Sequence, residues 1–135
     1  MTIKLRAANS ADAKNIAALV NLSGEGMPES LWSAQADYGQ DPISVGRSRA
    51  LGDSGALSWR NATIAELNGH TAGMLITYET PQEPEVVDST THPLFRPLIK
   101  LENQVPRTRY INALATFPQF QMKGVGRRLM AEAEK

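Results

Sequence analysis

The chain has 135 residues, with 14 basic and 14 acidic side chains and a formal net charge of zero. Hydrophobic residues make up 41% of it, which excludes an intrinsically disordered chain and predicts one domain with its own core. The absence of cysteine excludes disulfides, thiolate metal sites and a cysteine nucleophile. No apolar run is long enough to cross a membrane and we expect no secretory signal, so a cytoplasmic protein without a membrane partner is expected.

The zero net charge conceals an asymmetry along the chain. Residues 1–102 carry 8 basic and 12 acidic side chains, a net charge of −4, whereas residues 103–135 carry 6 and 2, a net charge of +4. No Asp or Glu occurs from Asn103 to Ala131. A basic segment in a neutral protein favours a local anionic ligand over bulk binding to nucleic acid.

The first third of the chain is predicted to be one strand followed by helices. Thr2–Arg6 alternates polar and apolar residues, as a short strand does. Ala11–Val20 follows an Asn-Ser cap and has helical apolar spacing, and Asn21–Gly26 is expected to end that helix. Pro28 begins a second helix, and Asp41-Pro42 has the cap-plus-proline pattern that starts a third, which fades near residue 52.

The middle of the chain changes to a strand pattern. Ala62–Leu67 and His70–Thr80 are apolar runs separated by Asn68-Gly69, which is the strongest short signal for a β-hairpin because both turn residues need positive φ. The second run is apolar on both faces, so it should be a central strand. Pro81–Pro93 contains three prolines and is predicted to be a loop.

The last third contains a short amphipathic helix at Leu94–Gln104, a strand at Thr108–Phe117 and a helix that begins near Gly124. The resulting order of elements is typical of an α/β domain with an embedded hairpin. Residues 132–135 are still helix-forming and the strand at 108–117 lacks a later partner. We therefore expect residues 1–135 to be a single, incomplete domain. This strand should be an exposed edge unless another chain or the missing C-terminal part pairs with it.

The segment from Tyr110 to Leu129 has the most informative pattern: a strand, a turn at Pro118, a loop with two spaced glycines and the start of a helix. Backbone N–H groups at a helix N-terminus bind anions, and glycines let a phosphate approach the backbone. Lys123, Arg127 and Arg128 add positive charge where the helix dipole disfavours it. The pattern predicts a pyrophosphate site.

Two other phosphate-binding motifs fit poorly. The dinucleotide-binding fingerprint needs a third glycine where Leu129 stands. The Gly-x-x-x-x-Gly-Lys-Ser/Thr motif of nucleoside triphosphatases does not occur.

The same segment resembles the acetyl-CoA-binding motif of the general N-acetyltransferase (GNAT) superfamily. Gln121, Gly124 and Gly126 match its Gln/Arg-x-x-Gly-x-Gly/Ala pattern, and the preceding strand with Pro118 is similar to the family's fourth strand. The hairpin at 62–80 resembles strands two and three. The resemblance implies a mixed, mostly antiparallel sheet flanked by helices, of the acyl-CoA N-acyltransferase type, also classed as α+β, with its C-terminal part missing.

The resemblance also implies the contacts to acetyl-CoA as co-substrate. Backbone groups of Leu114, Ala115 and Thr116 would pair with the pantetheine arm. The pyrophosphate would lie against a loop whose members are Gln121, Met122, Lys123, Gly124, Val125, Gly126 and Arg127. A strand N–H near Leu114–Thr116 would stabilise the oxyanion of the reaction.

The residues that carry the chemistry are less defined. The family's carboxylate base on the fourth strand has no counterpart, since Tyr110 and Asn112 occupy the corresponding polar positions. Glu25, Glu29 and His70 are the other candidates for acid–base work. The two histidines have no metal-site spacing, so no metal is expected.

Together these features predict an enzyme that transfers acetyl from acetyl-CoA to a small-molecule or peptide amine. A catalytically silent acyl-CoA-binding or sensing module and a phosphate- or nucleic-acid-binding module stay open as alternatives. Nucleic acid is the least favoured partner, because no aromatic side chains interleave with the basic ones. A homodimer stays open as the assembly.

Overall fold

A computed structural model describes residues 2–80, 86–91, 93, 95–104 and 108–135. It divides into two compact units, one formed by residues 1–77 and 111–135 and the other by residues 78–110. Part of the loop expected at 81–93, including His92, lies outside the described residues, as do Leu94 and Arg107. None of the described helices combines the length and apolar character needed to span a membrane.

Four strands form one sheet in the order β1-β2-β3-β4, with β1 at Ile3–Ala7, β2 at Ala62–Leu67, β3 at His70–Glu79 and β4 at Arg109–Thr116. Adjacent strands are antiparallel. The expected hairpin is confirmed: Asn68 and Gly69 have φ of 52° and 82°. β3 is central and buries five consecutive residues, as predicted. β4 is at the edge of the described sheet.

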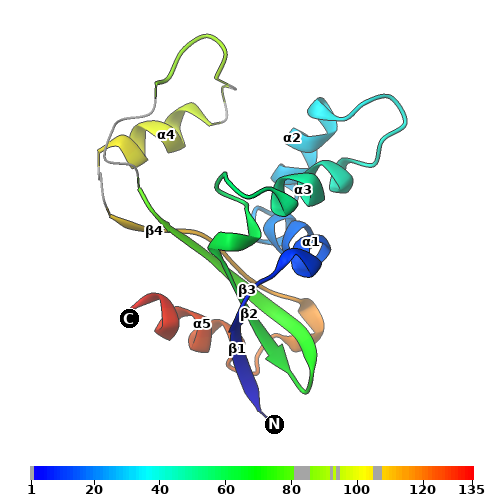
Figure 1. Ribbon diagram of the computed structural model, residues 1–135, viewed down its shortest axis with the longest axis vertical. Helices are drawn as coiled ribbons and strands as arrows, with labels where there is room; N and C mark the ends of the chain where they lie inside the picture. Colours follow the sequence, from blue (N-terminus) through cyan, green and yellow to red (C-terminus); the bar gives the residue numbers. More distant parts are fainter. Residues whose placement is uncertain (1, 81–85, 92, 94, 105–107) are drawn as a thin grey trace. The chain divides into compact units, whose positions relative to one another are not determined.

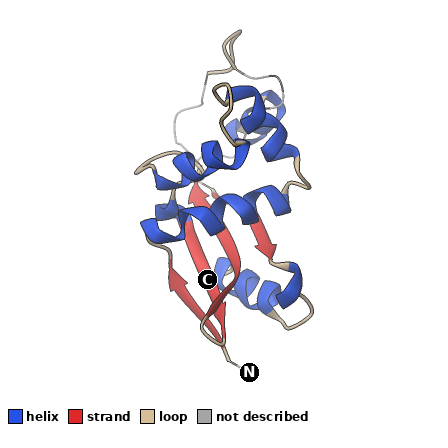
Figure 2. Ribbon diagram, turned by 90° about the vertical axis from the view of Figure 1, so that its right-hand side faces the viewer, coloured by secondary structure: helices blue, strands red, loops and turns tan. Residues whose placement is uncertain are grey.

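The helices of the first unit cover the sheet from two sides. Helices α1 (Ala13–Ser23), α2 (Met27–Gln35) and α3 (Pro42–Leu51) pack on one another, while α5 (Val125–Ala133) contacts β1 and β2. Figure 1 shows α1 and α5 on opposite sides of the strands, and Figure 2 shows helices lying across them. The expected antiparallel sheet flanked by helices is confirmed.

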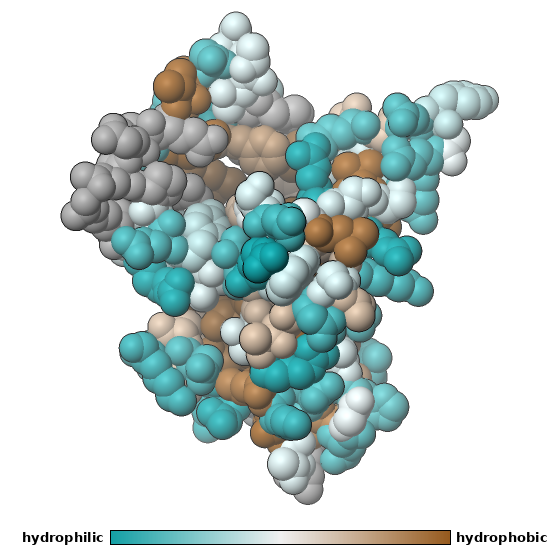
Figure 3. Space-filling view, in the orientation of Figure 1, coloured by the Kyte–Doolittle hydropathy of each residue, from teal (hydrophilic) through white to brown (hydrophobic). Residues whose placement is uncertain are grey.

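Side-chain alternation on β1 fixes this arrangement. Ile3 and Leu5 pack against the core on the α5 side, which contains Leu75, Val125 and Leu129. Arg6 points the other way and binds Asp12 at the start of α1. The exposed apolar side chains form separate patches among hydrophilic ones on the face seen in Figure 3.

One helix boundary differs from the sequence prediction. Residues Asn21–Gly26 were expected to end the first helix, but α1 continues to Ser23 and ends at Gly24. The Asn21 side chain does not compete for its own backbone, because its Oδ1 accepts from Glu29 N at 2.9 Å and its Nδ2 donates to Glu29 Oε2 at 3.3 Å. The extra turn extends α1 through Leu22 and Ser23.

The second unit, residues 78–110, contains the end of β3, helix α4 (Arg96–Asn103) and the start of β4. Thr80 is buried; its N–H donates to Thr108 O and its Oγ1 accepts from Thr108 N, both at 2.8 Å. The rings of Tyr78 and Tyr110 lie 5.6 Å apart. These contacts join the residues at the end of β3 to those at the start of β4.

Candidate acyl-CoA site

The loop from β4 to α5 is anchored at its start and open at its end. Phe117 N donates to Ala72 O on β3 at 2.8 Å, and Gln121 Nε2 donates to Thr116 O at 3.2 Å. Met122 and Gly124 then adopt left-handed conformations, with φ of 64° and 87°. Glycine suits this conformation, whereas a methionine there carries backbone strain.

The start of α5 has a run of unpaired backbone donors. Its N-cap, Gly124, has no side chain to cap the helix, and the first N–H bonded to it is that of Arg128, at 3.0 Å from Gly124 O. Within the part of the chain that the structure describes, the N–H groups of residues 122–127 donate to no protein acceptor. Such groups are the donors that a helix N-terminus offers to an anion.

The charges around this loop also suit an anionic ligand. Lys123, Arg127 and Arg128 are exposed, and none of them forms an ion pair with the described residues. Cations in the first turn of a helix oppose its dipole and normally weaken it by about 0.3–1 kcal/mol. A bound pyrophosphate would reverse that penalty.

A groove of about 370 Å³ lies beside the loop, lined by Leu22, Ser23, Leu114, Ala115, Thr116, Gln121 and Gly126. Its lining residues come from the end of α1, the end of β4, and the glycine loop with the start of α5. Five of the ten residues predicted to contact acetyl-CoA line it. Of the others, Met122, Lys123 and Gly124 are exposed on the loop, Arg127 is exposed in the first turn of α5, and Val125 is buried in the core.

The end of β4 is held in place by a close backbone approach. A Cβ added at Gly73 on β3 would lie 2.7 Å from Ala115 O and 2.9 Å from Val125 Cγ1. Only glycine leaves room there, so the backbone of β3 lies directly against the Ala115 carbonyl of β4 and the Val125 side chain of α5. This packing fixes Ala115 relative to the helix that carries the loop.

The sequence prediction missed Leu22 and Ser23, because it ended the first helix before them. Ser23 Oγ donates to Val20 O at 3.1 Å, and Leu22 leaves 39% of its surface exposed. The sequence does contain a signal for the longer helix: Gly24 follows Ser23 directly and is the C-cap of α1.

The acid–base candidates do not converge on the groove. Glu25 is exposed and strained, with φ of 54°, and Asn112 is exposed on β4. Tyr110 belongs to the second unit, where it contacts Tyr78. His70 is exposed, with its ring 6.4 Å from that of Phe120. Neither a carboxylate nor an imidazole from the described residues lines the groove.

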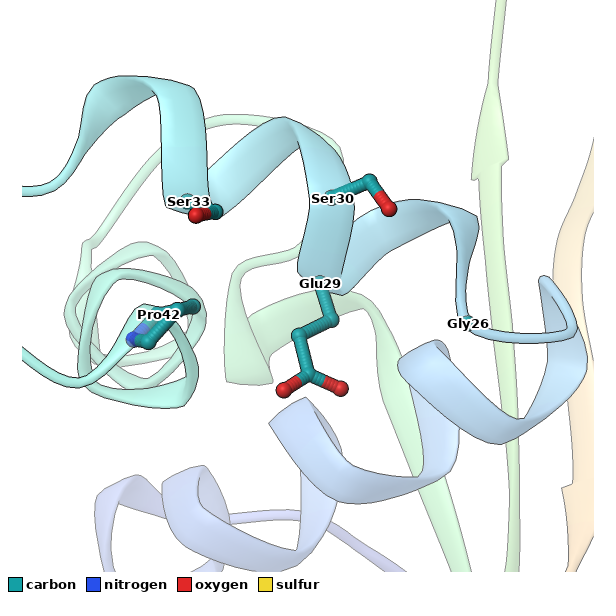
Figure 4. Close-up of a pocket in the computed structure, with 5 residues that line it drawn as sticks. All are labelled: Gly26, Glu29, Ser30, Ser33 and Pro42. Atoms are coloured by element: carbon teal, nitrogen blue, oxygen red, sulfur yellow. The ribbon is translucent and has the colours of Figure 1, made fainter.

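Glu29 lines a different hollow, between α2 and α3, with Gly26, Ser30, Ser33 and Pro42 (Figure 4). Among the described residues, no group of three or more potential metal ligands occurs.

The model of the acetyltransferase (GNAT) family matches residues 28–135, and the chain therefore belongs to this family. No curated protein sequence matches it. Among solved structures, it is similar to an acetyltransferase with 17% identity and a TM-score of 0.68, covering 96% of this chain and 71% of that one. An N-acetyltransferase from Staphylococcus aureus Mu50 has 15% identity and a TM-score of 0.61, with 96% and 73% covered.

A third similar structure contains part of the expected ligand. AAC(6')-Iy in complex with the bisubstrate analog CoA-S-monomethyl-acetylneamine has 13% identity and a TM-score of 0.52, with 99% of this chain and 70% of that one covered. At these identities the likeness establishes a shared acetyltransferase fold.

Proposed function

We propose that this protein binds acetyl-CoA in the groove beside β4 and transfers its acetyl group to an amine. The observation that carries the proposal is the run of unpaired N–H groups at residues 122–127, which adjoins the groove and is surrounded by free cations. These donors and Arg127 would hold the pyrophosphate, and the pantetheine arm would follow Leu114, Ala115 and Thr116. Membership of the acetyltransferase family supports this assignment.

In the proposed reaction a neutral amine attacks the thioester carbonyl, an amide bond forms, and the carbon–sulfur bond breaks to release the thiol of CoA. A backbone N–H at the end of β4 would stabilise the intermediate oxyanion. The proton lost by the amine passes through water to the leaving sulfur, which departs as the thiol, because the described lining of the groove offers no carboxylate or imidazole.

Calorimetric titration with acetyl-CoA tests the binding step. Gly124→Glu places a side chain on a left-handed backbone and a negative charge among the pyrophosphate donors, so it should abolish measurable binding. Gly55→Glu is the matched control, because Gly55 also has a left-handed φ, of 96°, but lies in a loop outside the groove. Failure of the parent protein to bind, or equal loss in both variants, would refute the proposal.

One observation favours a second function, acyl-CoA binding without transfer: the described groove has no acid–base side chain. A panel of primary amines with detection of released thiol separates the two functions. Thiol release that depends on one amine class supports transfer, whereas tight binding with no release for any amine supports the binding module.

A further inference from the structure

Met122, in the loop that joins β4 to α5, is the most exposed methionine of the described chain. Its relative exposure is 102%, against 56% for Met27 and 0% for Met74, while Met130 is half-buried. The Met122 side chain therefore packs against nothing in the protein, and its sulfur is open to solvent. Since its backbone is also left-handed, with φ of 64°, folding stability does not explain a methionine at this position.

The composition of the chain leaves methionine as its only sulfur-containing residue. There is no cysteine among the 135 residues, so the thioethers of the five methionines are the only sulfur atoms. Thioether sulfur is soft and polarisable, and peroxides convert it to a sulfoxide that reductases can reverse. Because susceptibility follows solvent access, Met122 is where a peroxide reacts first among the described methionines.

Oxidation at Met122 changes what the loop offers to an anion. The N–H groups of residues 122–127 donate to no described protein acceptor, and the neighbouring Lys123 forms no ion pair with the described residues. A thioether is a weak hydrogen-bond acceptor, whereas a sulfoxide is polar and has an oxygen with partial negative charge. The sulfoxide oxygen would therefore compete with phosphate oxygens for these N–H groups and for Lys123.

We infer that Met122 is a reversible oxidation site whose sulfoxide weakens the binding of acyl-CoA to this loop. A lone pair of Sδ attacks one oxygen of hydrogen peroxide, the O–O bond breaks, and the other oxygen leaves as hydroxide. The proton on the transferred oxygen passes to the hydroxide to give water, so the sulfur is oxidised by two electrons and the peroxide is reduced. The site itself follows from exposure, whereas the effect on acyl-CoA rests on the proposed function.

Graded treatment with hydrogen peroxide, followed by tryptic digestion and mass spectrometry, tests the site. Met27, Met74, Met122 and Met130 fall on separate tryptic peptides, so their rates are measured in one sample. Sulfoxide should form at Met122 about twofold or more faster than at Met27, and about tenfold or more faster than at the buried Met74. A Met27 rate equal to that of Met122, or above it, would overturn the inference.

Calorimetric titration with acetyl-CoA before and after peroxide treatment tests the effect on binding. The affinity of the parent protein should fall by about threefold or more, and methionine sulfoxide reductase should restore it. Met27→Leu is the matched control and should lose as much affinity on treatment as the parent, whereas Met122→Leu should show equal affinities before and after treatment. An unchanged parent affinity, or an equal loss in Met122→Leu, contradicts the role assigned to Met122.

The same titrations separate the role of Met122 from the proposed function. Untreated protein that binds acetyl-CoA with an affinity insensitive to peroxide overturns the inference and leaves the proposed function intact. Untreated protein that does not bind refutes the proposed function together with the effect on binding, and the peptide rates still decide the oxidation site. Thermal unfolding verifies that the treated protein and both variants are folded.

Discussion

The short 3-10 helix that leads into α1 and the N-terminus of α5 differ in how their backbone N–H groups are paired. In the 3-10 helix, Ser10–Asp12, Asn9 Oδ1 accepts from Ala11 N at 2.9 Å and Asp12 Oδ2 accepts from Asn9 N at 2.8 Å, a reciprocal capping box. At α5 the cap is a glycine, the nearby charges are positive, and the N–H groups of residues 122–127 have no described protein partner.

Helix α2 also has a left-handed glycine, Gly26, as its N-cap, but its Glu29 N–H is paired with Asn21 Oδ1 of α1. At the start of α3, Asp41 Oδ1 accepts from Ile43 N at 3.0 Å. Side chains of the protein thus pair with backbone N–H groups before α1 and at the starts of α2 and α3, whereas the N–H groups at the start of α5 have no described protein acceptor. The contrast teaches that the missing cap is as informative as the glycines, since unsatisfied donors are costly unless water or a ligand pairs with them.

The largest predicted effect concerns Asp12, in the capping box before α1. Asp12→Ala removes two 2.8 Å bonds to Arg6 and half of the capping box, so the free energy of unfolding should fall by about 3 kcal/mol in urea titrations. Asp53→Ala, which breaks the exposed pair with Arg60, is the control and should cost less than about 0.5 kcal/mol. Similar losses in both would contradict the structural role assigned to Asp12.

Substitutions of Gly126, in the first turn of α5, should separate effects on folding stability from effects on acetyl-CoA affinity. A Cβ at Gly126 meets no atom within 4 Å, so Gly126→Ala should raise stability by about 0.5–1 kcal/mol with acetyl-CoA affinity retained. Gly126→Asp should also stabilise the helix but weaken binding about tenfold or more, about 1.4 kcal/mol, because its carboxylate competes with the pyrophosphate. Denaturation and calorimetry on both variants measure the two effects, and unchanged affinity in Gly126→Asp would argue against the loop as the anion site.

The stability that Asp12 contributes should also depend on pH. Hydrogen bonds from Arg6 hold the pKa of Asp12 below its usual value. Its contribution to stability is therefore full above the unfolded-state pKa of about 4 and declines as pH falls through the folded-state value. We expect urea midpoints of the parent to fall between pH 5 and pH 2 more steeply than those of Asp12→Asn. Parallel curves would show that this carboxylate does not control acid stability.

The smallest predicted effect concerns backbone strain at Met122, in the loop before α5. Asn tolerates the left-handed conformation better than Met, so Met122→Asn should raise stability by about 0.5 kcal/mol. Asn68→Ala is the reverse control in the hairpin turn and should lower it by about 1 kcal/mol. Thermal unfolding of the two variants measures both, and a destabilised Met122→Asn would show that the methionine side chain has a role of its own.

Much of the fold could be predicted from the sequence because its signals are local. The Asn68-Gly69 turn requires positive φ, Asp41-Pro42 begins a helix, and apolar spacing in the first helix identifies Ile16, Leu19 and Val20 as buried. The predicted end of α1 was wrong because the side chain of Asn21 has its partner on α2, eight residues away. Sequence rules treat such a residue as a local helix breaker.

The candidate site was predictable to the extent that it is a contiguous motif. Gln121, Gly124 and Gly126 lie within six residues, and β4 ends at Thr116, shortly before them. Ser23 and Leu22 reach the groove from α1, and Glu29 meets α3 across another hollow. Their relevance depends on which helices pack together, and no spacing in the sequence records that.

The sequence by itself determined the antiparallel strands, the glycine loop at the start of the last helix and the position of the sign change in charge, because hydrophobic period, turn chemistry and charge are properties of neighbouring residues. The tertiary structure decided that side chains pair with backbone N–H groups before α1 and at the starts of α2 and α3, while the N–H groups of residues 122–127 have no described protein acceptor. Whether a polar group is satisfied depends on distant packing, so only the folded chain defines what it offers to a ligand.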